Sequence, residues 1–144
     1  MIVSQILKSK PDVGVISVTP TSTVTDAAKL LSHHRIGTVV VSTDGSSLDG
    51  ILSERDIVRE LGKRGTECLS DPVSALMTSK LVTCSPTNTA LEVLEMMTEG
   101  RFRHLPVMDD GKMVGLISIG DAVKGRLSQL AMEKESLEGM IMGH

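Results

Sequence analysis

The chain has 144 residues, of which 40% are hydrophobic and 23% charged, and its formal net charge at pH 7 is −3. This composition is typical of a folded globular protein and argues against disorder. The negative charge and a single aromatic residue, Phe102, disfavour nucleic acid as a partner, because nucleic-acid binding needs a basic surface and often aromatic stacking. No apolar run reaches the roughly 18 residues of a membrane span, and the first residues lack a signal-peptide pattern, so we expect a cytoplasmic protein with no membrane partner.

One segment of the sequence occurs twice. Residues 18–58 and 84–123 align along their length, with Pro20 opposite Pro86. Each copy alone is small for a stable domain, so we expect the two copies to pack about a pseudo-two-fold axis.

A shorter segment ahead of each copy is also repeated, since Val3–Leu7 resembles Val73–Met77. These similarities predict a first repeat at residues 1–61 and a second repeat at residues 73–144. The residues between them, 62–72, contain two glycines and an Asp-Pro pair, which are typical of a linker.

Each copy predicts the order strand, helix, strand, strand, helix, so the expected fold class is α+β. The expected strands of the first copy are residues 15–19, 38–41 and 48–53. Those of the second copy are residues 81–85, 105–108 and 113–118. Thr89 and Glu92 have the spacing of a capping box at the first helix of the second copy. Asp-Gly pairs at 44–45 and 110–111 predict the hairpin turns.

The last helix is expected to be the longest, running from Asp121 nearly to the C-terminus. Residues along it recur at alternating steps of four and three, as in a coiled-coil seam. This seam consists of Val123, Leu127, Leu130, Lys134, Leu137 and Ile141, of which only the lysine is polar. The pattern fits docking onto the chain's own core and a homodimer contact equally well.

Each copy also carries Ser-x-x-Asp where the last strand meets the last helix, as Ser53 with Asp56 and Ser118 with Asp121. Such a motif caps a helix. The same groups suit a nucleotide, because the N–H groups of a helix start attract phosphate and a carboxylate accepts hydrogen bonds from ribose hydroxyls. The repetition of the motif at matching positions adds weight to the second interpretation.

Arg101, Arg103 and His104 stand just before the second strand of the second copy. The fixed fork of donors in an arginine side chain suits phosphate. A loop that simply faces solvent would have a similar composition.

Taken together, these features resemble a tandem pair of CBS domains, the family named after cystathionine β-synthase. The likeness covers nearly the whole chain and is most specific at Gly50–Asp56, with the sequence GILSERD. The resemblance implies a non-catalytic regulatory module of signal transduction, with no metal site, that senses an adenine ligand in the cleft between the repeats. The ligands it implies are AMP, ADP, ATP, S-adenosylmethionine or a dinucleotide such as NAD.

The resemblance also assigns roles to individual residues, with Asp56 and Asp121 on the ribose and Ser53 and Ser118 on the phosphate. Further phosphate contacts implied in this way are Arg101, Arg103, His104, Arg55 and Lys124. The residues implied to line the base pockets are Ile36, Gly37, Thr38 and Phe102. Because Glu54 places a negative charge beside the first site, we expect Ser118 and Asp121 to form the better AMP site.

Members of the family form dimers, often as a flat disc of four repeats, so the resemblance implies a homodimer and a separate effector protein. Two other functions stay open. One is a structural dimerisation module in which both Ser-x-x-Asp motifs only cap helices. The other is an enzyme whose nucleophile would be Cys84 with His104 or His33 as the base.

Overall fold

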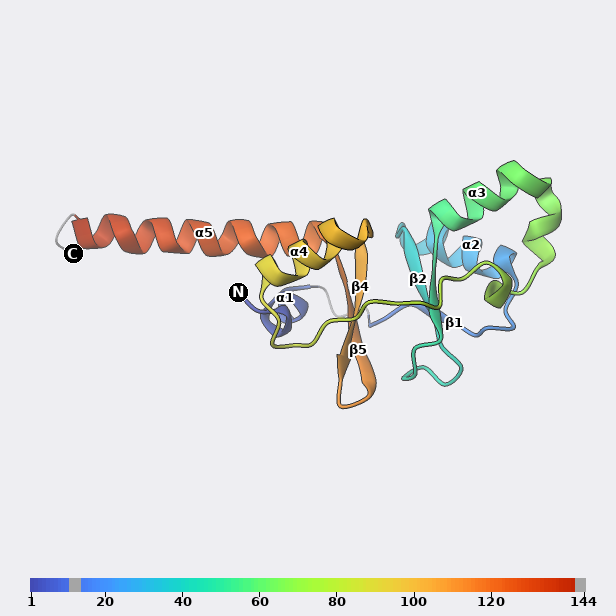
Figure 1. Ribbon diagram of the computed structural model, residues 1–144, viewed down its shortest axis with the longest axis horizontal. Helices are drawn as coiled ribbons and strands as arrows, with labels where there is room; N and C mark the ends of the chain where they lie inside the picture. The colour runs from blue at the N-terminus through green and yellow to red at the C-terminus, as the bar shows by residue number, and fades with distance from the viewer. Residues whose placement is uncertain (11–13, 142–144) are drawn as a thin grey trace. The chain divides into compact units, whose positions relative to one another are not determined.

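The computed structural model describes residues 1–10 and 14–141, and the chain divides into two compact units (Figure 1). The terminal unit consists of Met1–Asp12, Thr83–Val107 and Leu116–His144, and the central unit consists of Val13–Val82 and Met108–Gly115. Each unit therefore draws segments from both halves of the sequence. The boundaries of the repeats along the chain, 1–61 and 73–144, stay a prediction.

The central unit contains a three-stranded sheet and the helices that cover it. Its elements are β1 (Ser17–Val18), α2 (Val24–His34), β2 (Thr38–Val41), β3 (Gly50–Ser53), α3 (Glu54–Arg64), η1 (Gly65–Ser70) and η2 (Val73–Ala75). The strand order is β1-β2-β3, with β1 parallel to β2 and β3 antiparallel to it. The expected order of strand, helix, strand, strand, helix is confirmed here.

The core of the central unit lies between the sheet and the two helices α2 and α3. Val39, Val41 and Leu52 from the sheet are fully buried and pack with Ala27 of α2 and Ile57 of α3. All four residues of β2 are buried, as expected for the middle strand of a sheet.

Residues 62–72, expected as a linker, contain helical turns and one buried side chain, and their role as a linker stays a prediction. Helix α3 continues to Arg64, and η1 follows it directly. Cys68 is fully buried, and the hydroxyl of Thr25 in α2 donates to the carbonyl of Leu69 at 2.8 Å. Arg64 also forms an ion pair with Asp71. Gly65 ends α3 and Asp71 ends η1, while Cys68 and Leu69 between them anchor the segment to the central unit.

Gly50, the first residue of β3, has no space for a side chain. A Cβ atom there would lie 2.8 Å from the carbonyl oxygen of Thr78, whose backbone is fixed by its pairing with Ile51. We expect Gly50→Ala to lower the free energy of unfolding by about 1–3 kcal/mol, the usual cost of overpacking. Urea unfolding measures this change.

The control for this variant is Gly62→Ala, because Gly62 lies within α3 and nothing surrounds its Cβ position within 4 Å. The control should raise stability by about 0.5–1 kcal/mol, since alanine favours a helix over glycine. A Gly50→Ala protein as stable as the wild type would show that β3 and the Thr78 backbone can separate at little cost.

The terminal unit is built on a two-stranded sheet. Its elements are α1 (Val3–Ser9), α4 (Ala90–Gly100), β4 (His104–Asp109), β5 (Lys112–Ser118) and α5 (Ile119–Ile141), and the tip of the β4–β5 hairpin groups with the central unit. The strand expected at residues 81–85 is reduced to a single bridge between Cys84 and Val107. The capping box of α4 is confirmed, because Thr89 and Glu92 bond each other's backbone N–H groups. The core contains Val3, Val93 and Leu105 from three separate segments, all fully buried.

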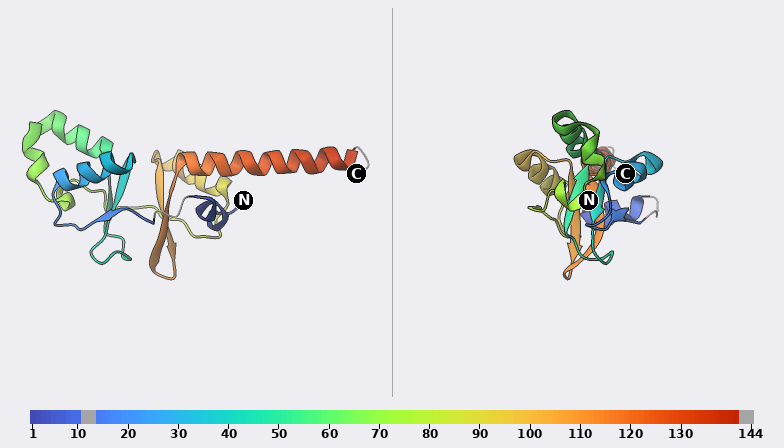
Figure 2. Two further views of the ribbon diagram at one scale, coloured as in Figure 1. Left: turned by 180° about the vertical axis from the view of Figure 1, so that it is seen from behind. Right: turned by 90° about the vertical axis from the view of Figure 1, so that its right-hand side faces the viewer.

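Helix α5 extends well past α4 as a single helix (Figures 1 and 2). Its early turns pack on the terminal unit, where Ala122 and Gly125 are buried. The last side chain with a bond to the rest of the unit is Gln129, which accepts a hydrogen bond from the N-terminal ammonium group at 2.5 Å. Every residue of 130–138 is exposed. The prediction of a long final helix is confirmed, with its start at Ile119.

Candidate functional site

The two Ser-x-x-Asp motifs form the same corner in the two units. The hydroxyl of Ser53 accepts from the backbone N–H of Asp56 at 3.2 Å, and the Asp56 carboxylate accepts from the N–H of Ser53 at 2.9 Å. In the terminal unit the corresponding distances between Ser118 and Asp121 are 3.1 and 2.9 Å. Both motifs are therefore helix caps, as the structural interpretation of the sequence requires.

A second backbone bond brings a predicted ligand-binding loop to each corner. The N–H of Glu54, at the start of α3, donates to the carbonyl of Gly37 at 2.9 Å. The N–H of Ile119, at the start of α5, donates to the carbonyl of Arg103 at 2.8 Å. In each unit the Ser-x-x-Asp corner therefore lies beside the loop that leads into β2 or β4. Thr38 follows this loop in the central unit, and His104 follows it in the terminal unit.

In both corners the serine hydroxyl also interacts with the carboxylate of its own motif. The hydroxyl of Ser53 lies 3.0 Å from an oxygen of Asp56 and donates to it. The hydroxyl of Ser118 accepts from the N–H of Asp121 at 3.1 Å, and its own hydrogen bond to the Asp121 carboxylate helps to lower the pKa of Asp121. A hydroxyl has one hydrogen to donate, so in either corner a ligand phosphate would have to take it from the carboxylate.

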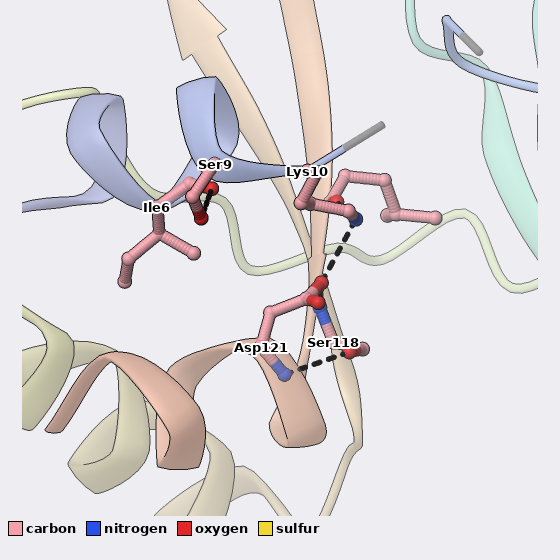
Figure 3. A network of polar contacts seen from close by, with 6 residues as sticks. Ile6, Ser9, Lys10, Ser118 and Asp121 are labelled. Atoms are coloured by element: carbon pink, nitrogen blue, oxygen red, sulfur yellow. Dashed lines mark hydrogen bonds and ion pairs between the residues drawn. The ribbon is translucent and has the colours of Figure 1, made fainter. Parts of the chain in front are cut away.

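Asp121 has an ion-pair partner that the sequence analysis missed (Figure 3). The Nζ atom of Lys10 lies 2.8 Å from Oδ2 of Asp121 and 3.0 Å from the carbonyl oxygen of Leu116. Burial of the Asp121 carboxyl works to raise its pKa, but the hydrogen bonds from Lys10 and Ser118 outweigh burial and hold the pKa below its usual range. Asp121 is therefore a carboxylate at neutral pH.

Asp56 has a weaker partner. Its Oδ1 atom lies 3.3 Å from Nη1 of Arg59, which is one turn further along the same helix and largely exposed. Exposed pairs of this kind hold their geometry weakly, since water screens the charges. The two corners therefore share a backbone but differ in the cations around them.

The other predicted residues lie around these corners with different exposures. Arg101 ends α4 in a left-handed conformation and is exposed, as are Arg55 and Lys124 in the first turns of α3 and α5. Phe102 packs against the core of the terminal unit, and its ring covers Gly100. The roles implied for these side chains at a ligand stay predictions.

The central unit also has an open pocket of about 460 Å³ between α2 and α3. Ile36 and Gly37, both predicted to line a base pocket, are among its lining residues, together with Arg35 and Glu54. Ser53 and Asp56 do not line it. The pocket therefore contains part of the predicted base site of this unit but not its Ser-x-x-Asp corner.

The structure gives no support to Cys84 as a nucleophile. Cys84 is 4% exposed, and burial raises the pKa of its thiol to about 11. A thiol needs to be a thiolate to attack, so this group is unreactive at neutral pH. Among residues 1–10 and 14–141, no three His, Cys, Asp or Glu side chains are grouped to hold a metal ion; His144 lies outside the described residues. The helices described there include none long and apolar enough to cross a bilayer.

Known proteins share both the sequence and the fold of this chain. The CBS domain family model matches residues 3–63 and 73–128. The mitochondrial CBS domain-containing protein CBSX3 of Arabidopsis thaliana is 35% identical over 148 residues, which cover 98% of this chain and 72% of the relative. The crystal structure of the CBS-domain containing protein ATU1752 from Agrobacterium tumefaciens has a TM-score of 0.82 and 40% identity, and covers 88% of this chain and 99% of its own.

Two similar solved structures hold adenine ligands. CBSX2 in complex with AMP has a TM-score of 0.73 and 27% identity, and covers 88% of this chain and 96% of its own. The CBS domain pair of protein MJ0100, in complex with 5′-methylthioadenosine and S-adenosyl-L-methionine, has a TM-score of 0.73 and 25% identity, and covers 93% of this chain and 98% of its own. Since the family matches both copies of the repeat, the chain belongs to the CBS-domain family as a tandem pair of CBS domains.

Proposed function

We propose that this protein is a non-catalytic regulatory module that binds AMP or a closely related adenine nucleotide, and that Ser118 and Asp121 form its principal contact with the ligand. One observation carries the proposal. Around the start of α5 the structure places the hydroxyl of Ser118, an ionised carboxylate and the ammonium group of Lys10. A ribose phosphate needs these three kinds of partner.

The groups divide between the ribose and the phosphate by their chemistry. The hydrogen bonds from Lys10 and from the N–H of Ser118 both reach Oδ2 of Asp121, so Oδ1 can accept from a ribose hydroxyl. The hydroxyl of Ser118 and the positive end of the α5 dipole suit a phosphate oxygen. Arg103, whose backbone is bonded to this corner, adds a second cation from the neighbouring loop.

The central corner is less suited to a phosphate. Glu54 stands at the first position of α3, where the terminal unit has Ile119. A carboxylate at a helix start repels a second anion there. We propose that AMP prefers the terminal corner and that the central corner takes a different adenine ligand or none. The bound ligands AMP and S-adenosyl-L-methionine in similar structures support an adenosine ligand, whereas NAD has no counterpart among them.

Calorimetric titration of the purified protein with AMP tests this function. AMP at about 100 times its Kd should raise the free energy of unfolding by about 2.7 kcal/mol, which a thermal-shift experiment also detects. Absence of binding by AMP, ADP, ATP and S-adenosylmethionine would favour a structural dimerisation module. Conversion of the nucleotide during the titration would favour an enzyme. The cytoplasm as compartment and a separate effector protein as target stay predictions.

We also propose that the protein forms a homodimer through the exposed part of α5. Within the described part of the chain, no hydrogen bond or ion pair joins residues 130–141 to any part of the protein outside α5, and an isolated helix of this length is marginal in water. Its seam is nevertheless apolar and exposed: Leu127, Leu130, Leu137 and Ile141 are each between 43 and 77% exposed. A second copy of the same helix would cover this seam.

The charges of α5 favour an antiparallel arrangement of the two copies. Its first half holds Lys124 and Arg126 against Asp121, a net charge of +1 (2 − 1), whereas its second half holds Glu133, Glu135 and Glu138 against Lys134, a net charge of −2 (1 − 3). In an antiparallel pair related by a two-fold axis, the basic half of each helix faces the acidic half of its partner. A parallel pair would place like charges together. The self-complementary charge pattern therefore supports a second copy of this chain as the partner of α5.

A further inference from the structure

The position of Lys10 links the beginning of the chain to the start of its last helix. Lys10 follows directly after α1, and its side chain reaches Asp121 and the end of β5 (Figure 3). The side chain is 36% exposed, so its ammonium group is held by the protein and still accessible to solvent.

The ion pair between Lys10 and Asp121 does not use every hydrogen-bonding group of the two side chains. An ammonium group has three hydrogens to donate, and Lys10 uses two of them, on the carbonyl of Leu116 and on Oδ2 of Asp121. Within the described residues the third has no acceptor. Oδ2 of Asp121 already accepts from Ser118 and Lys10, while Oδ1 accepts from neither. The pair therefore offers one N–H donor and one carboxylate oxygen side by side.

We infer that Lys10 determines ligand specificity at this corner by donating to the phosphate of an adenosine 5′-phosphate whose ribose is held by Asp121. This inference rests on the proposed function. The ammonium favours an anionic ligand over adenosine, which has no charge, and over S-adenosylmethionine, which carries a sulfonium cation. Asp121 positions Lys10 for this contact, so both groups act without leaving their ion pair.

A lysine occurs at this position in both copies of the short repeat, but only Lys10 pairs with the aspartate of a Ser-x-x-Asp motif. Ser9 and Lys10 correspond to Ser79 and Lys80 when the short repeat of Val3–Leu7 and Val73–Met77 is extended. Lys80 is exposed and, among the described residues, has no hydrogen bond or ion pair. Asp56 pairs with Arg59 of its own helix instead. The selection for phosphate is therefore expected at the terminal corner alone.

Lys10→Met tests the inference, because methionine keeps an unbranched apolar stem and removes the ammonium group. AMP and adenosine are each titrated into the wild type, Lys10→Met and the matched control Lys80→Met. We expect Lys10→Met to weaken AMP binding by roughly 10- to 100-fold, as for loss of a charge-assisted hydrogen bond, and to change adenosine binding by less than about 3-fold. Lys80→Met should bind both ligands as the wild type does, and Lys10→Arg should keep the preference for AMP.

The titrations separate failure of this inference from failure of the proposed function. A wild type that binds neither ligand overturns both. A wild type that binds AMP, with Lys10→Met weakened equally for AMP and adenosine or unchanged for both, overturns only the role of Lys10. Stronger binding of both ligands by Lys10→Met would show that the lysine obstructs the site and would also overturn it. Should Lys10→Met fail to fold, Lys10→Gln replaces it under the same criteria.

Discussion

Replacing Asp121 with asparagine should weaken AMP binding by about 100-fold. Asparagine keeps the size of the side chain and can still accept from the N–H of Ser118, so the helix cap remains. It loses the negatively charged carboxylate that accepts hydrogen bonds from Lys10 and from a ribose hydroxyl. If the amide oxygen keeps the bond from Ser118, the amide N–H₂ group faces the ammonium group of Lys10, and two donors then oppose each other. Loss of a hydrogen bond to a charged group costs about 1.5–3 kcal/mol, and more than one such bond is affected. Calorimetric titration with AMP measures the change.

Asp56→Asn is the matched control, because Asp56 occupies the same position in the central corner and makes the same backbone bond. It should leave AMP affinity within about 3-fold of the wild type, and urea unfolding should show both variants folded. If Asp121→Asn binds AMP as the wild type does, Asp121 is only a cap. If the two variants lose the same affinity, the two corners contribute equally and the preference for the terminal corner is wrong.

The parts of the fold that depend on neighbouring residues could be predicted from the sequence. The two helix starts at Ser53 and Ser118 follow from a capping motif spanning four residues, and the hairpin of β4 and β5 turns at the expected Asp-Gly pair, where Asp110 and Gly111 both have positive φ. Short-range hydrogen bonds decide such features, so a local pattern contains the necessary information.

Features that depend on distant segments could not be predicted in this way. The bond between Lys10 and Asp121 joins residues 111 positions apart, in two segments of the interleaved terminal unit. The extended repeat of Ser9-Lys10 in Ser79-Lys80 is the one sequence signal for this lysine, and it does not say which copy finds a carboxylate. Likewise, the burial of Cys68 follows from its packing against distant residues, which no local pattern in the sequence indicates.

The proposed α5 dimer predicts that Leu130→Asp makes the protein monomeric. Leu130 lies in the middle of the exposed seam, and a carboxylate there would be buried without a partner in the dimer. Sedimentation equilibrium should change from twice the mass of one chain, 15.4 kDa, to that single mass. Met132→Asp is the matched control, since Met132 is also exposed but lies on the opposite side of the helix from the seam.

Lys134→Leu should have the reverse effect. Lys134 is the one charged residue of the seam, and a lysine in such a position specifies register at a cost in stability. Leucine there should strengthen the dimer by at least 10-fold in Kd, because burying an aliphatic side chain contributes about 1.5–3 kcal/mol. A wild type that sediments as a monomer, or a Leu130→Asp protein that stays dimeric while Lys134→Leu changes nothing, would contradict pairing through α5. In the second case the dimer must form through another surface, and α5 would need a different partner to cover its apolar seam.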